Sequence, residues 1–152
     1  KIVAAGYAFD GLQYNFALAR YNADDGSLDT SFNDPGICIV GTPCRGTLAT
    51  DFGAEYDTAS ASAVALQSNG KIVAAGGAQG TGVPPVIALA RYTPDGALDT
   101  GFGVGGKETT AVVGGALATA MVVQADDRIV TAGMGIDLSV GRLVLVLTRY
   151  LP

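Results

Sequence analysis

The chain has 152 residues, of which 49% are hydrophobic and 15% are charged, and its formal net charge is −5. This composition is too apolar for a disordered chain, and an acidic chain without a basic stripe is a poor candidate for binding nucleic acid. Histidine is absent, which excludes a Ser-His-Asp triad and any zinc site that contains histidine. No apolar run approaches the ~18–20 residues of a membrane helix, so we expect no membrane span.

About ten short segments are predicted to be strands, because each is rich in β-branched or small apolar residues and is bounded by Gly, Asp, Asn or Pro. In chain order they are KIVAAG (1–6), FALARY (16–21), GTLATDFG (46–53), AVALQ (63–67), KIVAAG (71–76), IALARY (87–92), GKETT (106–110), TAMVVQ (119–124), RIVTAG (128–133) and LVLTRY (145–150). The same phrases return in the same order, which is the signature of a repeat protein.

Three segments between these strands carry turn signals. Asn69-Gly70 can supply the positive φ of a tight hairpin turn. The third repeat has Asp126-Asp127 there, and Asp tolerates the left-handed region better than most residues. In the longer turn over residues 92–103, Gly96 is expected to take the left-handed position.

The ALARY strands are apolar on both faces until their last residues, so we expect each to be buried on both sides. No helical period accompanies them, and the remaining way to cover both faces is to stack sheet against sheet. The sequence therefore predicts an all-β, β-propeller-like stack of four-stranded antiparallel blades. It holds about two and a half blades in one domain (1–152): a partial blade over 1–59 that lacks its first strand, a full blade over 60–117, and a partial blade over 118–152 that lacks its last strand.

The repeated phrases LQSNGKIVAAG, FALARY and DGSLDTSF together resemble the delta-60 repeat family of bacterial β-propeller repeats, which occur in secreted and surface proteins. The resemblance covers essentially the whole chain. It implies a propeller fold and an extracellular or cell-surface location, and it carries over no catalytic residue. The segment CIVGTPC (38–44) is unusual for the repeat, and a closed propeller normally has at least four blades.

This shortfall of blades leaves three readings open. The chain is part of a larger propeller, or it associates with copies of itself into a ring or filament, or it is a self-contained β fold of another kind. Exposed apolar faces and unpaired strand edges at the ends of the stack would favour association. Because residue 1 is not Met and already lies in a predicted strand, we expect either a processed precursor or a piece of a larger array.

Cys38 and Cys44 lie six residues apart in an insertion within the first repeat. We expect a disulfide that closes this loop and indicates an oxidising compartment. The alternative is a pair of reduced thiols. A catalytic cysteine is not expected, because no histidine is present to activate it.

Aspartates cluster in the loops that follow the ALARY strands. They could bind calcium, although the spacing does not match an EF-hand. The alternative is that they cap turns by accepting backbone N–H bonds. The residues are Asp24, Asp25, Asp29, Asp95 and Asp99.

The predicted strands FALARY, IALARY and LVLTRY each end in arginine followed by tyrosine. These pairs are Arg20-Tyr21, Arg91-Tyr92 and Arg149-Tyr150. We expect each arginine to pair with the Asp of the following turn, and each tyrosine to anchor packing while its hydroxyl reaches water or backbone. The alternatives are an anion-binding ring of arginines and a sugar-binding ring of tyrosines.

The sequence thus predicts an extracellular structural or interaction protein without enzymatic activity, cofactor or metal. It would assemble through exposed blade faces and strand edges, into a filament or surface layer or within a larger propeller. The alternative function is a glycan- or ligand-binding propeller module. The chain has only two glutamates, Glu55 and Glu108, and no carboxylate pair for glycoside hydrolysis can be chosen from the sequence.

Overall fold

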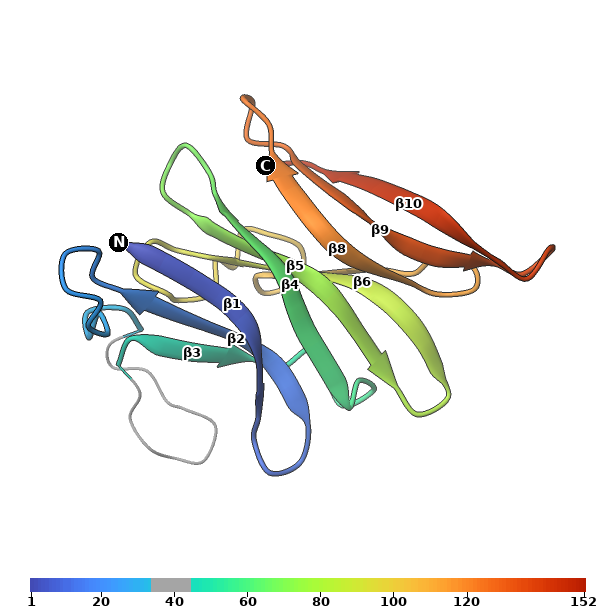
Figure 1. Cartoon of the computed structure of the whole chain (residues 1–152), viewed down its shortest axis with the longest axis horizontal. Coiled ribbons are helices and arrows are strands. Elements are labelled where there is room, and N and C mark those ends of the chain that lie inside the picture. Colours follow the sequence, from blue (N-terminus) through green and yellow to red (C-terminus); the bar gives the residue numbers. More distant parts are fainter. Residues whose placement is uncertain (34–44) are drawn as a thin grey trace.

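The structure is a computed structural model, and it describes residues 1–33 and 45–152. This part of the chain forms ten β-strands and contains no helix (Figure 1). The predicted all-β class is therefore confirmed. Among the described residues, no helical segment has the length and hydropathy of a membrane span.

The strands form three antiparallel units, which we call the first, second and third blades. The first blade contains β1 (Ile2–Phe9), β2 (Tyr14–Tyr21) and β3 (Thr47–Thr50). The second contains β4 (Thr58–Leu66), β5 (Ile72–Gly80), β6 (Val83–Tyr92) and β7 (Lys107–Thr110). The third contains β8 (Ala116–Val123), β9 (Ile129–Asp137) and β10 (Arg142–Tyr150).

Within residues 1–33 and 45–152, this arrangement matches the predicted two and a half blades, because the first blade has no strand equivalent to β4 and the third has none equivalent to β7. A single parallel bridge between Tyr14 and Thr58 joins the first two blades into one continuous sheet. Strands β4 and β8 begin before residues 60 and 118, where the sequence placed the blade boundaries. Ala59 and Ala116 occupy the same repeat position near the start of these strands, and both are buried.

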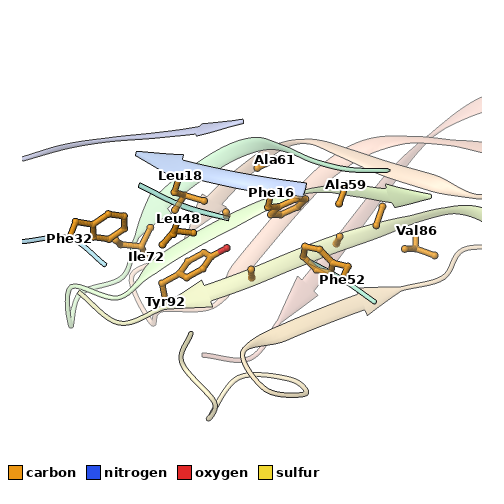
Figure 2. Close-up of a cluster of buried hydrophobic side chains, with 14 residues drawn as sticks. Phe16, Leu18, Phe32, Leu48, Phe52, Ala59, Ala61, Ile72, Val86 and Tyr92 are labelled. Atoms are coloured by element: carbon orange, nitrogen blue, oxygen red, sulfur yellow. The ribbon is translucent and has the colours of Figure 1, made fainter. Parts of the chain in front are cut away.

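The blades stack face to face, with the second blade between the other two (Figure 1). Phe16 and Leu18 project from β2 onto the second blade, where they meet small residues of β5 and β6. Figure 2 shows these side chains lying between the two layers, with Tyr92 of β6 beside them. The buried members of this first cluster are Phe16, Leu18, Phe32, Leu48, Phe52, Ala59, Ala61, Ile72, Ala74, Ala78, Val86, Ala88, Ala90 and Tyr92.

The same scheme repeats between the second and third blades. Ile87 and Leu89 project from the other face of β6, and both are fully buried. The cluster between these blades contains Val73, Ala75, Ile87, Leu89, Phe102, Ala116, Ala118 and Ile129. The second blade is therefore covered on both faces, which explains why its strands are apolar on both sides.

The glycine at the end of each KIVAAG segment allows the first strand of the blade, β4 or β8, to approach closely. A Cβ added to Gly76 would lie 2.0 Å from the carbonyl oxygen of Ser60, and one added to Gly133 would lie 1.9 Å from that of Leu117. Both contacts sit at β-bulges, in β4 and β8 respectively. At the equivalent Gly6 an added Cβ meets nothing within 4 Å, because the first blade lacks this inner strand.

The turns follow the predicted chemistry where a positive φ was expected. Gly70 has φ 81°, Gly96 has φ 97° and Asp127 has φ 61°. Asp127 also links two blades, since its carboxylate accepts a hydrogen bond of 2.7 Å from the backbone N–H of Ser68. The hydrogen bond from the Ser68 hydroxyl, followed by this backbone contact, lowers the pKa of Asp127.

Candidate interaction surfaces

An ion-pair cluster closes the first blade beside the turn that follows β2. Arg20 donates from Nε to the Asp29 carboxylate at 2.7 Å, and Lys1 approaches the same oxygen at 3.2 Å. The guanidinium lies over the Phe32 ring at 4.6 Å from its centroid. The Ser31 hydroxyl, Lys1 and Arg20 all hold the pKa of Asp29 well below its usual range.

The second blade repeats this cluster with the same residue types at the same repeat positions. Arg91 pairs with Asp99 at 2.6 Å, and Lys71 reaches the same carboxylate at 2.9 Å. Arg91 also lies over the Phe102 ring. The predicted pairing of arginine with the following turn is thus confirmed in two blades, and both arginines serve the fold.

The third blade differs. Arg128 pairs with Asp126 in its own hairpin turn. Arg149, at the position of Arg20 and Arg91, is exposed and has no ion-pair partner among residues 1–33 and 45–152.

The tyrosines connect neighbouring blades. The hydroxyls of Tyr92 and Thr50 share a hydrogen bond of 2.7 Å, and those of Tyr150 and Thr110 share one of 2.9 Å. We expected these hydroxyls to reach water or backbone, and that expectation was wrong for both residues. Each threonine lies on the last strand of one blade, β3 or β7, and its tyrosine lies on the next blade. The sequence of one repeat does not show which residues of the neighbouring blade lie beside it. Burial raises the pKa of Tyr92.

The loop aspartates mostly accept local hydrogen bonds. Asp25 accepts from the backbone N–H of Ser27 at 2.9 Å and from its hydroxyl at 2.7 Å, and Asp29 and Asp99 belong to the ion-pair clusters above. In the described ranges, no group of three or more acidic or cysteine side chains is placed to hold a metal ion. Cys38 and Cys44 lie outside the described residues, so their disulfide stays a prediction.

One blade face is open at each end of the stack. Leu145 and Leu147 occupy the repeat positions of Phe16 and Leu18, which are buried, yet they are 73% and 65% exposed. Met134 and Ile136 of β9 are exposed on the same side of the third blade. We call this surface, formed by Met134, Ile136, Leu145 and Leu147, the open face of the third blade.

The opposite end of the stack presents small residues, with Ile2, which is 54% exposed, and its cross-strand partner Tyr21 at one edge. Alternation along β1 and β2 places Val3, Ala5, Phe16 and Leu18 against the second blade and turns the intervening alanines away from it. These alanines line a shallow hollow of about 360 Å³. We call this surface, formed by Ala4, Ala8, Ala17, Ala19 and Ala49, the open face of the first blade.

A third surface was missed by the sequence analysis. Tyr7, Phe9 and Tyr14 form an exposed aromatic group at one end of the β1–β2 hairpin. Tyr14 packs edge-on against Tyr7, with ring centroids 5.6 Å apart, and 5.0 Å from Phe9. Tyr7 and Phe9 replace Gly77 and Gln79 of the second repeat, so no recurring phrase drew attention to them.

The structure also brings together the two glutamates of the chain. Glu55 and Glu108 line one hollow of about 300 Å³ between the first two blades, together with Lys107. The Lys107 ammonium donates to the carbonyl oxygen of Asp51 at 2.8 Å. Sequence reasoning could not pair these glutamates, because they lie 53 residues apart in different blades.

Comparison with known proteins bears on the fold. No curated protein matches the chain. A family model described as "Domain of unknown function (DUF5122) beta-propeller" matches residues 1–32 and 67–102. Each matched stretch holds the same unit, which is two antiparallel strands and the ion-paired turn that follows them. The match and the stacked antiparallel blades together identify the fold as all-β and β-propeller-like.

Proposed function

We propose that this chain is a structural, non-catalytic interaction protein that assembles head to tail with copies of itself. The open face of the third blade would pack on the open face of the first blade of the next copy. One observation carries the proposal: a repeat position that is fully buried in the second blade, at Leu89, is 65% exposed in the third, at Leu147. Removing such a side chain from water is worth about 1.5–3 kcal/mol.

The two interfaces inside the chain support this pairing. In both, a face with large side chains packs on a face with smaller ones. Phe16 and Leu18 meet Ala88 and Ala90 between the first two blades, and Leu89 meets the third blade in the second cluster. The two free ends of the stack show the same difference in side-chain size. One end presents leucines, and the other presents alanines around a hollow.

The same difference in side-chain size argues against pairing of two first-blade faces. Two open faces of the first blade would bring alanine against alanine and leave both hollows unfilled, and voids forfeit packing energy. A head-to-tail contact is heterologous, so it either closes a ring or continues as a filament.

We also infer that the repeats are of the delta-60 type and that the protein works outside the cell. The support is the LQxxGKIVxAG segment at 66–76, the DGxLDxxF segment that occurs at 25–32 and again at 95–102, and the pair Cys38 and Cys44 in the first repeat. Intact mass measured with and without reductant tests the disulfide, because oxidation removes two hydrogens. Two free thiols in the native material would refute it.

Light scattering coupled to size-exclusion chromatography tests the assembly with two variants. Ala19→Arg places a charge on the open face of the first blade, and Leu147→Arg places one on that of the third. We expect the wild type to associate as its concentration rises, while each variant alone stays at the monomer mass of 15.3 kDa. Val113→Arg, at an exposed turn residue, is the control and should associate like the wild type.

Mixing the two variants distinguishes the modes of contact. Each variant retains one intact face, so an equimolar mixture should form dimers of twice the monomer mass and nothing larger. Dimers of either variant alone would indicate contact between like faces and overturn the head-to-tail arrangement. A wild type that stays monomeric, or a longer natural polypeptide whose own repeats cover both faces, would overturn self-assembly.

A further inference from the structure

We infer that the aromatic group on the β1–β2 hairpin, with the hydroxyl groups of β4 beside it, is a carbohydrate-binding site. This inference goes beyond the proposed assembly and uses a different surface. Phe9 and Tyr14 lie outside the hollow used in assembly, whereas Tyr7 borders both that hollow and the one beside the aromatic group. The assembly contact uses the alanines on the other side of β1. Both activities could therefore coexist in one molecule.

The rings of the aromatic group pack against one another, which fixes their positions. Tyr7 and Tyr14 make an edge-to-face contact, with planes at 79°, and Phe9 packs on Tyr14. Tyr7 and Tyr14 line a hollow of about 230 Å³ with Thr58 and Ser60 of β4. Aromatic rings left exposed in this way present an apolar surface with a polar hydroxyl at its edge.

A second hollow continues from the first on the other side of β4. It measures about 240 Å³ and shares Thr58 and Ser60 with the aromatic hollow. Its other polar lining includes Ser62, Gln79 and Thr119. Within residues 1–33 and 45–152, no hydrogen-bond partner occupies the side chains of Thr58, Ser60, Ser62 or Gln79.

The two hollows together match the surface of a sugar chain. A pyranose ring has an apolar C–H face, which packs on aromatic rings, and a rim of hydroxyls. Those hydroxyls both donate and accept hydrogen bonds, as the side chains of Ser60 and Ser62 do. A proline-rich peptide also docks on aromatic grooves, but its carbonyl groups only accept. The acceptor capacity of the groove therefore favours a neutral oligosaccharide.

Packing in the two blade interfaces supports the view that the aromatic residue at position 7 is not needed for the fold. Tyr7 and Ser60 occupy the repeat positions of Gly77 and Leu117, so the large and small residues are exchanged between the interfaces. At the second interface Leu117 fills the space, since a Cβ on Gly77 would lie 1.9 Å from its Cδ2 atom. At the first interface Tyr7 stays 63% exposed, and Ser60 leaves the hollow beside it.

Tyrosine fluorescence gives a direct binding assay, because the chain has six tyrosines and no tryptophan. The probes are soluble β-1,4-linked glucose and N-acetylglucosamine oligomers, α-1,4-linked glucose oligomers and decaproline, titrated to 10 mM and checked by calorimetry. We expect at least one oligosaccharide to bind. Tyr7→Ala should weaken it at least tenfold and Ser62→Ala several-fold. Leu12→Ala, on the exposed tip of the same hairpin, should not change it.

The results separate this site from the assembly. Ala19→Arg should leave sugar binding unchanged. Tyr14→Ala, at a residue outside the assembly hollow, should weaken sugar binding, leave association unchanged and give the wild-type circular dichroism spectrum. Absence of binding by all oligosaccharides at 10 mM would overturn the inference. So would equal binding by wild type and Tyr7→Ala, or binding of decaproline alone.

Discussion

Substituting one leucine in two different blades tests whether the blades stabilise one another by stacking. Leu89 and Leu147 occupy the same repeat position, but Leu89 is fully buried in the second cluster and Leu147 lies on the open face of the third blade. Leu89→Ala removes three carbon atoms from the core. At about 0.8 kcal/mol per buried methylene this amounts to about 2.4 kcal/mol.

The cavity left behind adds to this loss, and measured Leu→Ala costs in cores reach about 5 kcal/mol. We therefore expect Leu89→Ala to lower the free energy of unfolding by about 2.4–5 kcal/mol. At roughly 2–4 °C per kcal/mol for a domain of this size, the melting temperature should fall by about 5 °C or more. Leu147→Ala removes the same atoms from an exposed site and should change the stability by no more than about 0.5 kcal/mol.

Urea unfolding followed by circular dichroism measures both variants against the wild type. The measurement belongs at low protein concentration, because binding of a second copy adds to the apparent stability. At high concentration the wild type should gain stability that Leu147→Ala does not gain. Equal losses for the two variants at low concentration would refute the reasoning, since they would mean that the third blade is covered in the isolated chain.

Three further predictions concern the glycines, the ion pairs and the tyrosines. Gly76→Ala should destabilise the fold by about 1–3 kcal/mol, because the added Cβ meets the Ser60 carbonyl at 2.0 Å, whereas Gly6→Ala should be nearly neutral; equal melting temperatures for the two variants would contradict this. The pKa of Asp99 is lowered from 3.8 by Lys71 and Arg91, so its contribution to stability is complete above about pH 4 and is lost as the pH falls through the folded-state value. Urea midpoints between pH 7 and pH 2.5 should therefore fall less steeply in Asp99→Asn, and parallel curves would contradict the assignment. Tyr92→Phe should lower the free energy of unfolding by about 1–3 kcal/mol, because it leaves the buried Thr50 hydroxyl without its partner, and an unchanged thermal melt would show that this bond is dispensable.

The strands and their order could be predicted because each blade reuses the same phrases. KIVAAG and ALARY recur with their turn residues, and their two apolar faces require a neighbour on each side. The pairing of Arg20 and Arg91 with the next turn could also be predicted, since the partners lie within ten residues in the sequence.

Contacts between blades could not be predicted in the same way. The hydrogen bond between Tyr92 and Thr50 joins residues 42 apart, and its partner strand β3 is short and weakly repeated. The aromatic group of Tyr7, Phe9 and Tyr14 could not be predicted either, because it is specific to the first repeat. Tyr7 and Phe9 stand where the second repeat has Gly77 and Gln79, so the repeated motifs do not include them.

The unlike faces of a blade give any row of copies a direction. One extremity would always display leucines and the other alanines, so growth at the two extremities need not be equally fast. A variant with only one functional face, such as Ala19→Arg, would act as a chain terminator at a single extremity. Small amounts of it should then set the length of the polymer without altering its internal contacts.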